Sequence, residues 1–167
     1  MSSTQSTLVS MALAVATLAT ACATAPQAPP SPGRLTVRVT PNPIVATPLE
    51  GEKFRFDFEL EIREAGGSDV SIDRVSAEVL AFGGLRIAGR TMNADEIERR
   101  GFATKVRGGD AIHYSFSQKH DVPDERLLGA VKAELLIEGT DALGNKTTAR
   151  ATVGVIRGEP DASVTPN

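Results

Sequence analysis

Few residues of this chain have the types and spacing that a catalytic or metal-binding site requires. The 167 residues include one cysteine, Cys22, and two histidines, His113 and His120, which lie seven positions apart without an acidic residue at a supporting spacing. Zinc sites need clustered cysteine and histidine ligands, so the sequence predicts no zinc site. No serine has the G-x-S-x-G frame of a nucleophile elbow, and the paired glycines belong to no phosphate-binding pattern. We therefore expect no catalytic residue, no cofactor and no metal, and the sequence predicts that the protein is not an enzyme.

Two weaker candidates for ligand binding remain. Asp141 and Asn145 lie in one turn and offer oxygen ligands for calcium. Calcium takes six to eight oxygens, however, and the same residues suit a tight turn for backbone reasons. A group of four cations is the other candidate, as an anion site: Arg99, Arg100, Lys105 and Arg107. Favourable interaction with the negative end of a helix explains the first two without any ligand.

The only cysteine follows a segment that is typical of protein export. Residues 8–18 are apolar or small, which fits a signal h-region and is too short to span a bilayer as a mature helix. Small residues then lead up to the cysteine as Leu18-Ala19-Thr20-Ala21-Cys22. This arrangement resembles the signal of bacterial lipoproteins, in which the cysteine is lipid-modified and becomes the mature N-terminus. The resemblance implies lipidation at Cys22, and Ala23 after it implies sorting to an outer membrane.

A soluble secreted protein is the alternative, because Ala19-Thr20-Ala21 also has the A-x-A form that signal peptidase cleaves after. The lipoprotein is favoured, since a lone cysteine in an exported chain has no internal disulfide partner. Residues 23–33 contain four prolines, and all 18 basic and 21 acidic residues lie at or after Arg34. Such a segment favours an extended tether. We expect a signal peptide (1–21), a lipidated cysteine with its proline-rich tether (22–33), a folded domain (34–158) and a disordered tail (159–167).

From Arg34 the apolar residues recur at every second position, which predicts β-strands. The clearest run lies in 53–63, where one face consists of Phe54, Phe56, Phe58, Leu60 and Ile62. Similar alternation marks 35–39, 70–82, 112–116, 131–137 and 147–155, and a weaker run lies at 85–87. In 70–82 the apolar phase slips between Ile72 and Val75, which indicates a β-bulge or bend.

One short helix is predicted between the two halves. Asn93 can cap its start, Glu96 stands three residues later as in a capping box, and Gly101 suits the exit. About seven strands with this helix predict an all-β fold, an immunoglobulin-like antiparallel β-sandwich with one short crossover helix.

The C-terminal half resembles a known family. The stretch from Val131, through Gly139-Thr140-Asp141-Ala142-Leu143-Gly144-Asn145, to Val153 is similar to the closing hairpin of bacterial immunoglobulin-like and fibronectin-type-III-like domains. This resemblance implies adhesion, display or assembly roles of the kind found in surface and periplasmic proteins.

Two classes of function follow from the sequence. The first is a noncatalytic cell-envelope lipoprotein, exported and anchored to the envelope by its lipid, that presents the immunoglobulin-like module to a protein partner. The second is an accessory subunit or small enzyme with a loop-built site in the 83–110 crossover. The net charge of −3 is spread without basic runs, so nucleic acid is not an expected partner.

Overall fold

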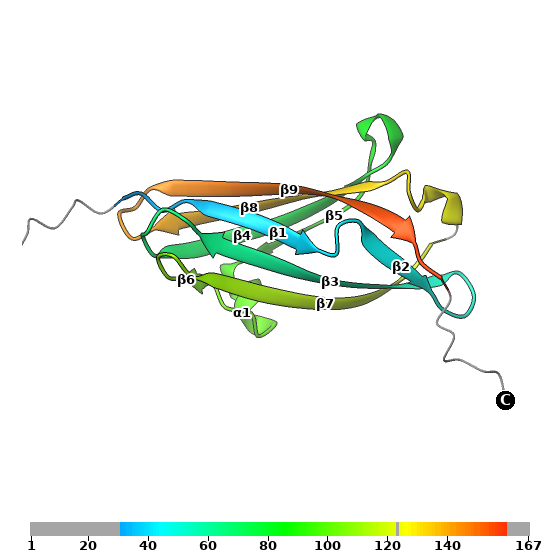
Figure 1. The fold of residues 1–167 in the computed structure, drawn as a ribbon, viewed down its shortest axis with the longest axis horizontal. Helices are drawn as coiled ribbons and strands as arrows, with labels where there is room; N and C mark the ends of the chain where they lie inside the picture. The colour runs from blue at the N-terminus through cyan, green and yellow to red at the C-terminus, as the bar shows by residue number, and fades with distance from the viewer. Residues whose placement is uncertain (1–30, 123, 160–167) are drawn as a thin grey trace, which may run out of the picture.

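Nine strands in two layers form most of the structure (Figure 1). The computed structural model describes residues 31–122 and 124–159. In chain order the strands are β1 (Leu35–Thr40), β2 (Ile44–Pro48), β3 (Lys53–Glu64), β4 (Val70–Leu80), β5 (Arg86–Asn93), β6 (Lys105–Val106), β7 (Ala111–Asp121), β8 (Lys132–Asp141) and β9 (Lys146–Arg157). The helices are η1 (Phe82–Gly84), α1 (Ala94–Arg99) and η2 (Glu125–Leu127).

The first layer has β3 at its centre. One edge of β3 pairs with β1 and then with β2, and the other edge pairs with β7. The second layer has the order β9-β8-β4-β5, and β6 pairs with the start of β4. A short parallel ladder between β2 and β9 joins the two layers. The predicted fold class, an all-β sandwich with one short α-helix, is confirmed.

The strand count differs from the expected seven for a physical reason. Two prolines, Pro41 and Pro43, follow cis peptide bonds between β1 and β2 and break what would be one edge strand into two. The alternation at 35–39 predicted β1 alone, so β2 was missed. Because β2 is a separate strand, it pairs with β9 as well as with β3. Its pairing with β9 is parallel, so the sheet is mixed rather than purely antiparallel. β6 adds a further pair of residues.

The core lies between the layers, as the alternation in β3 predicts. Phe54, Leu60 and Ile62 are fully buried, whereas Phe56 and Phe58 are half-buried and pack against the core from the same face. Burial of apolar side chains between two sheets is the main force that holds such a sandwich together.

The predicted phase slip and helix are both present. The register of β4 on β8 shifts between Ile72 and Arg74, so Ile72 and Val75 both face the core. At α1 the Asn93 side chain accepts a hydrogen bond from the Glu96 amide at 2.9 Å, and Ile97 is fully buried. The Glu96 carboxylate pairs with a neighbouring arginine instead of completing a capping box.

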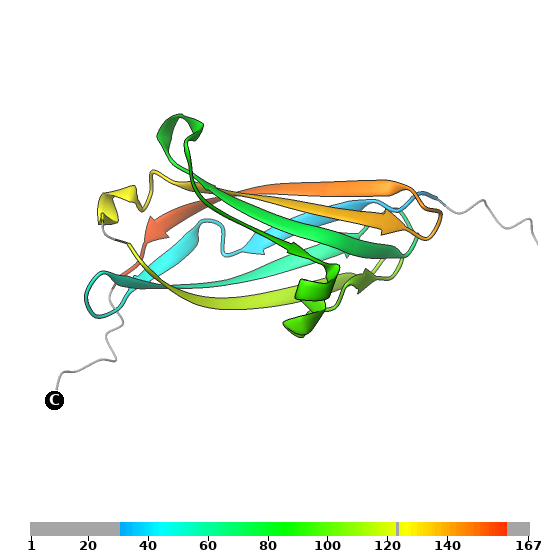
Figure 2. The same cartoon turned by 180° about the vertical axis from the view of Figure 1, so that it is seen from behind.

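The sandwich is elongated, with different segments at its two ends (Figures 1 and 2). One end, called here the N-terminal end, holds the start of β1 and the turns at 65–69, 107–110 and 142–145. The opposite end, called the far end, holds the turn at 49–52, η2 and the end of β9.

Candidate functional site

A buried carboxylate organises the N-terminal end. Glu64 is 1% exposed and accepts four backbone N–H groups, from Arg34 (2.8 Å), Gly66 (2.6 Å), Gly67 (2.7 Å) and Gly109 (3.0 Å). Burial raises the pKa of Glu64, but the four hydrogen bonds outweigh it and lower the pKa to about 2. The ionised side chain therefore ties the start of β1 to two turns.

Asp141 plays a similar part in the adjacent turn. Its carboxylate accepts the side-chain amide of Asn145 (3.0 Å) and the backbone N–H groups of Gly33 (2.9 Å), Leu143 (2.9 Å) and Asn145 (2.8 Å). These bonds, led by the Asn145 side chain, lower the pKa of Asp141 to about 2. The spacing that suggested calcium ligands is thus the spacing of a turn whose carboxylate is satisfied by protein donors. Within 31–122 and 124–159, no three His, Cys, Asp or Glu residues gather closely enough to hold a metal ion.

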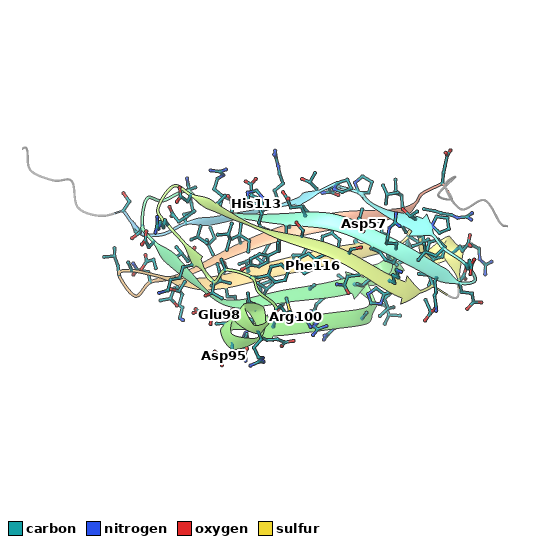
Figure 3. All side chains as sticks on the ribbon, turned by 90° about the horizontal axis from the view of Figure 1, so that it is seen from below. Asp57, Asp95, Glu98, Arg100, His113 and Phe116 are labelled. Carbon is teal, nitrogen blue, oxygen red and sulfur yellow. The ribbon has the colours of Figure 1, made fainter. Side chains whose placement is uncertain are left out.

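The two histidines lie on opposite faces of β7. His113 is exposed, and its Nδ1 lies 2.9 Å from a carboxylate oxygen of Glu59. The ring of His120 lies on the other face, 6.1 Å from that of Phe56 between centroids. Since neighbouring positions of a strand alternate between faces, their odd spacing of seven separates them. Figure 3 shows His113 and Phe116 on the two sides of the strand.

The four cations of the anion hypothesis are spread over two elements. Arg99 and Arg100 stand at the C-terminal end of α1, as expected, and Arg100 also pairs with Glu96 at 3.6 Å. Lys105 lies on β6, and Arg107 follows that strand in the turn before β7. The helix end therefore accounts for the position of the two arginines.

The hairpin between β4 and β5 carries a feature that the sequence analysis missed. Phe82 is 94% exposed, Leu85 67% and Ile87 49%, and these three residues are called here the apolar tip. The turn is closed by bonds from the Gly84 amide to the Ala81 carbonyl (3.0 Å) and from the Ala81 amide to the Leu85 carbonyl (2.8 Å). Figures 1 and 2 show this hairpin projecting from the body of the sandwich.

The composition of this turn could have identified it. Turns usually consist of glycine, proline, asparagine, aspartate and serine, yet here Phe82 and Leu85 flank two glycines. Gly83 and Gly84 both have positive φ (75° and 80°), which explains the glycines but not the apolar residues around them. The 83–110 crossover, where a loop-built site was considered, thus contributes Leu85 and Ile87 to the tip.

Two arginines of β5, the strand that follows the turn of the apolar tip, pair with glutamates of the same chain. Arg86 pairs with Glu78 (3.4 Å), and Arg90 pairs with Glu96 (2.8 Å). The Arg86 side chain lies across Gly89, where a Cβ atom would collide with the guanidinium. A glycine at this position therefore leaves room for the guanidinium beside its partner. Lys132 of β8 lies opposite Leu80, at the base of the hairpin.

The outer face of the second layer has a shallow hollow. Its lining mixes acidic and basic side chains, among them Arg74, Glu134, Glu138 and Arg150. Arg74 and Glu138 pair across it at 3.4 Å. This mixture is typical of a solvated sheet face.

Cys22 and the export segment lie outside the described residues. Within the described part of the chain, no helix has the length and apolar character needed to cross a membrane.

No protein-family model and no curated protein sequence matches this chain. Among solved structures, a crystal structure from Bordetella pertussis described as ApaA matches with a TM-score of 0.52 and 12% identity, covering 76% of this chain and 98% of that one. The structural genomics target SoR45 matches with a TM-score of 0.48 and 11% identity, covering 81% and 92%. At 12% identity the likeness to the Bordetella protein shows the β fold alone.

Proposed function

We propose that the protein is a noncatalytic cell-envelope lipoprotein, anchored through Cys22, whose β-sandwich holds a protein partner by its apolar tip. The exposure of Phe82 is the observation that carries this proposal. Large apolar side chains gathered on a surface mark interaction sites, and burying one against a partner yields about 1.5–3 kcal/mol. Aromatic side chains that enter a pocket are the usual energetic centre of protein interfaces.

The charges around the apolar tip favour a protein over a lipid surface. Binding to anionic headgroups relies on unpaired lysine and arginine beside the apolar residues. Here Arg86 and Arg90 are both paired with glutamates of the same chain, which leaves one lysine, Lys132 opposite Leu80, beside the hairpin. A neutral, projecting hairpin that ends in Phe82 suits a concave apolar pocket.

The proposed anchor and the apolar tip are compatible in space. Gly33 and Arg34 begin the domain at the N-terminal end, whereas the β4–β5 hairpin projects beyond the middle of the long axis, towards the far end (Figures 1 and 2). Lipid attachment ahead of Gly33 would hold the N-terminal end at the membrane and present the tip to proteins of the envelope.

Site-specific photo-crosslinking of the full-length protein in intact cells tests the partner. A photoreactive residue at Phe82 should give one recurring protein adduct, and Leu85→Ser should reduce its yield at least tenfold. Leu143, which is 50% exposed in a turn at the N-terminal end, supplies matched controls. A photoreactive residue there should give no such adduct, and Leu143→Ser should leave the Phe82 adduct unchanged. Adducts with lipid alone, or none, would contradict the proposal.

The anchor has its own test. The wild-type chain should incorporate a palmitate analogue and partition into detergent, and Cys22→Ser should abolish both. An unmodified mature N-terminus after Ala21 would show that the protein is secreted without a lipid.

A further inference from the structure

The outer edge of β7 is free of strand pairing in the described part of the chain. β7 pairs with β3 over its whole length of 11 residues, without a register shift. The bonds from the Glu64 amide to the Asp110 carbonyl and from the Val122 amide to the Glu52 carbonyl flank this ladder. Because an antiparallel ladder repeats every two residues, even-numbered residues of β7 bond to β3. Odd-numbered residues from 111 to 121 direct their N–H and C=O groups outwards.

This edge has few of the features that block edge-to-edge association. Natural edge strands are protected by prolines, bulges, shortness or several lysines. β7 has no proline, no bulge and one lysine, Lys119. The β5 edge of the second layer differs, because the β4–β5 ladder shifts register between Val79 and Leu80 and β5 carries two arginines.

We propose that β7 pairs antiparallel with β7 of a second copy of this chain, across a two-fold axis at Ser117. In this register His113 faces Asp121 of the second copy, and Lys119 faces Ser115 of the second copy. Both pairs consist of odd-numbered residues, so the outward N–H and C=O groups meet in hydrogen-bonded pairs. The two-fold axis forms each pair twice, as an isologous interface requires.

Side-chain pairing favours this register over one with its axis at Phe116. An axis at Phe116 would place Lys119 opposite His113 of the second copy and leave Asp121 opposite Ala111. An axis at Ser117 instead puts the Asp121 carboxylate opposite the His113 ring, whose N–H can donate a hydrogen bond to it. Lys119 then lies two strands across from Glu59 of the second copy, since Glu59 is the β3 neighbour of Ser115.

The proposed dimer also places a side chain of the second copy beside the Phe116 ring. Phe116 is half-buried, stacks on Phe58 at 4.9 Å and lies 5.3 Å from Phe102 (Figure 3). In the proposed dimer, Gln118 of the second copy lies opposite Phe116 on the inner face. The stem of Gln118 then covers part of the exposed ring. This observation is independent of the apolar tip, which belongs to the other layer.

Disulfide trapping tests the register. In a full chain carrying Cys22→Ser no other cysteine remains, so Ser117→Cys provides a single thiol on the proposed axis. Mild oxidation should convert most of this variant to a covalent dimer. Ser115→Cys, two residues along the same face, is the matched control. Its thiols should lie about 13 Å apart along the strands, and it should cross-link at least tenfold more slowly. Equal rates for the two variants, or faster trapping at position 115, would overturn the proposed axis.

Sedimentation of the same cysteine-free chain tests the association itself. The chain with Ser117 should sediment as a dimer at tens of micromolar. Ser117→Pro should make it a monomer with unchanged circular dichroism, because proline is tolerated where an edge N–H faces outwards. Lys119→Glu should weaken dimerisation at least tenfold through the acidic Glu59 of the second copy. Lys105→Glu makes the same charge change on β6 and should not. A monomer at 100 µM, or a dimer unaffected by Ser117→Pro, would overturn the proposal.

Discussion

Glu64 is the last residue of β3 and lies on its inward face. Its carboxylate is therefore buried at the N-terminal end, next to the apolar side chains of the strand. An isolated buried charge would cost several kcal/mol. Here four backbone N–H groups offset that cost, and charge-assisted bonds of this kind are stronger than neutral ones. One side chain thus holds the residue just before β1, the β3–β4 turn and the turn before β7.

Glu64→Gln should therefore destabilise the fold strongly. Glutamine removes the negative charge and turns one of the two acceptor oxygens into a donor that faces backbone N–H groups. We expect a loss of roughly 3 kcal/mol in the free energy of unfolding, measured by urea denaturation at pH 7. Glu61→Gln, on the outer face of the same strand, should change it by less than about 0.5 kcal/mol. Equal effects of the two substitutions would contradict the role assigned to Glu64.

Asp141 leads to a prediction about metal. Its carboxylate accepts four hydrogen bonds from the protein, and they reach both oxygens. Addition of EDTA or of millimolar calcium should therefore leave the thermal midpoint unchanged, as scanning calorimetry can show. A shift of several degrees in either case would mean that the 141–145 turn binds calcium.

At the scale of elements, β3 shows how a single strand serves two environments. Its inward face supplies fully buried Phe54 to one hydrophobic cluster and Leu60 and Ile62 to another. Its outward face carries charged side chains that pair with one another or with β7, such as Asp57 with Ser117 at 2.7 Å. The assignment of the two faces is therefore tested by comparing how substitutions on each face change the free energy of unfolding.

Phe54→Ala should cost roughly 3–5 kcal/mol in the free energy of unfolding, since it empties a fully buried site. Phe56→Ala should cost less than this, because its ring is half-buried. Glu59→Ala should stay within about 0.5 kcal/mol. These values come from denaturation of the three variants under one condition. A large effect of Glu59→Ala, or a negligible one of Phe54→Ala, would mean that the strand faces the other way.

At the scale of the whole molecule, the two carboxylates make the N-terminal end sensitive to acid. The pKa values of Glu64 and Asp141 are both lowered to about 2 in the folded state. The unfolded chain therefore binds more protons in acid than the folded chain does, and stability falls as pH decreases. The contribution is complete above the unfolded pKa values near 4 and is lost as pH falls towards 2.

We expect hydrogen exchange at pH 3 to open the N-terminal end first. The amides of Arg34, Gly66 and Gly109 should lose protection relative to pH 7, after correction for the intrinsic rates. The amide of Val122 at the far end bonds to a backbone carbonyl, which does not titrate, and serves as the internal reference. Uniform loss of protection at both ends would contradict a local acid response.

Much of the fold was predictable from the sequence, because the relevant signals are local. The two-residue period of apolar side chains set the faces of β3, β7, β8 and β9, and the phase slip between Ile72 and Val75 located the bulge. The capping pattern around Asn93 located α1. These features depend only on neighbours along the chain, so a sequence contains enough information to find them.

The sequence alone thus predicted a β-sandwich with one short helix over residues 34–158, and it missed β2 and β6. The positions of the unpaired surfaces depend instead on how the strands pack in three dimensions. Exposure of Phe82 depends on a hairpin that extends past the sheets. Two of the four partners of Glu64, Arg34 and Gly109, lie 30 and 45 residues away from it in sequence. The free edge of β7 likewise depends on the pairing of whole strands. These long-range relations depend on which strands pair in the fold, because a local pattern specifies the two faces of a strand but not the strand that lies beside it.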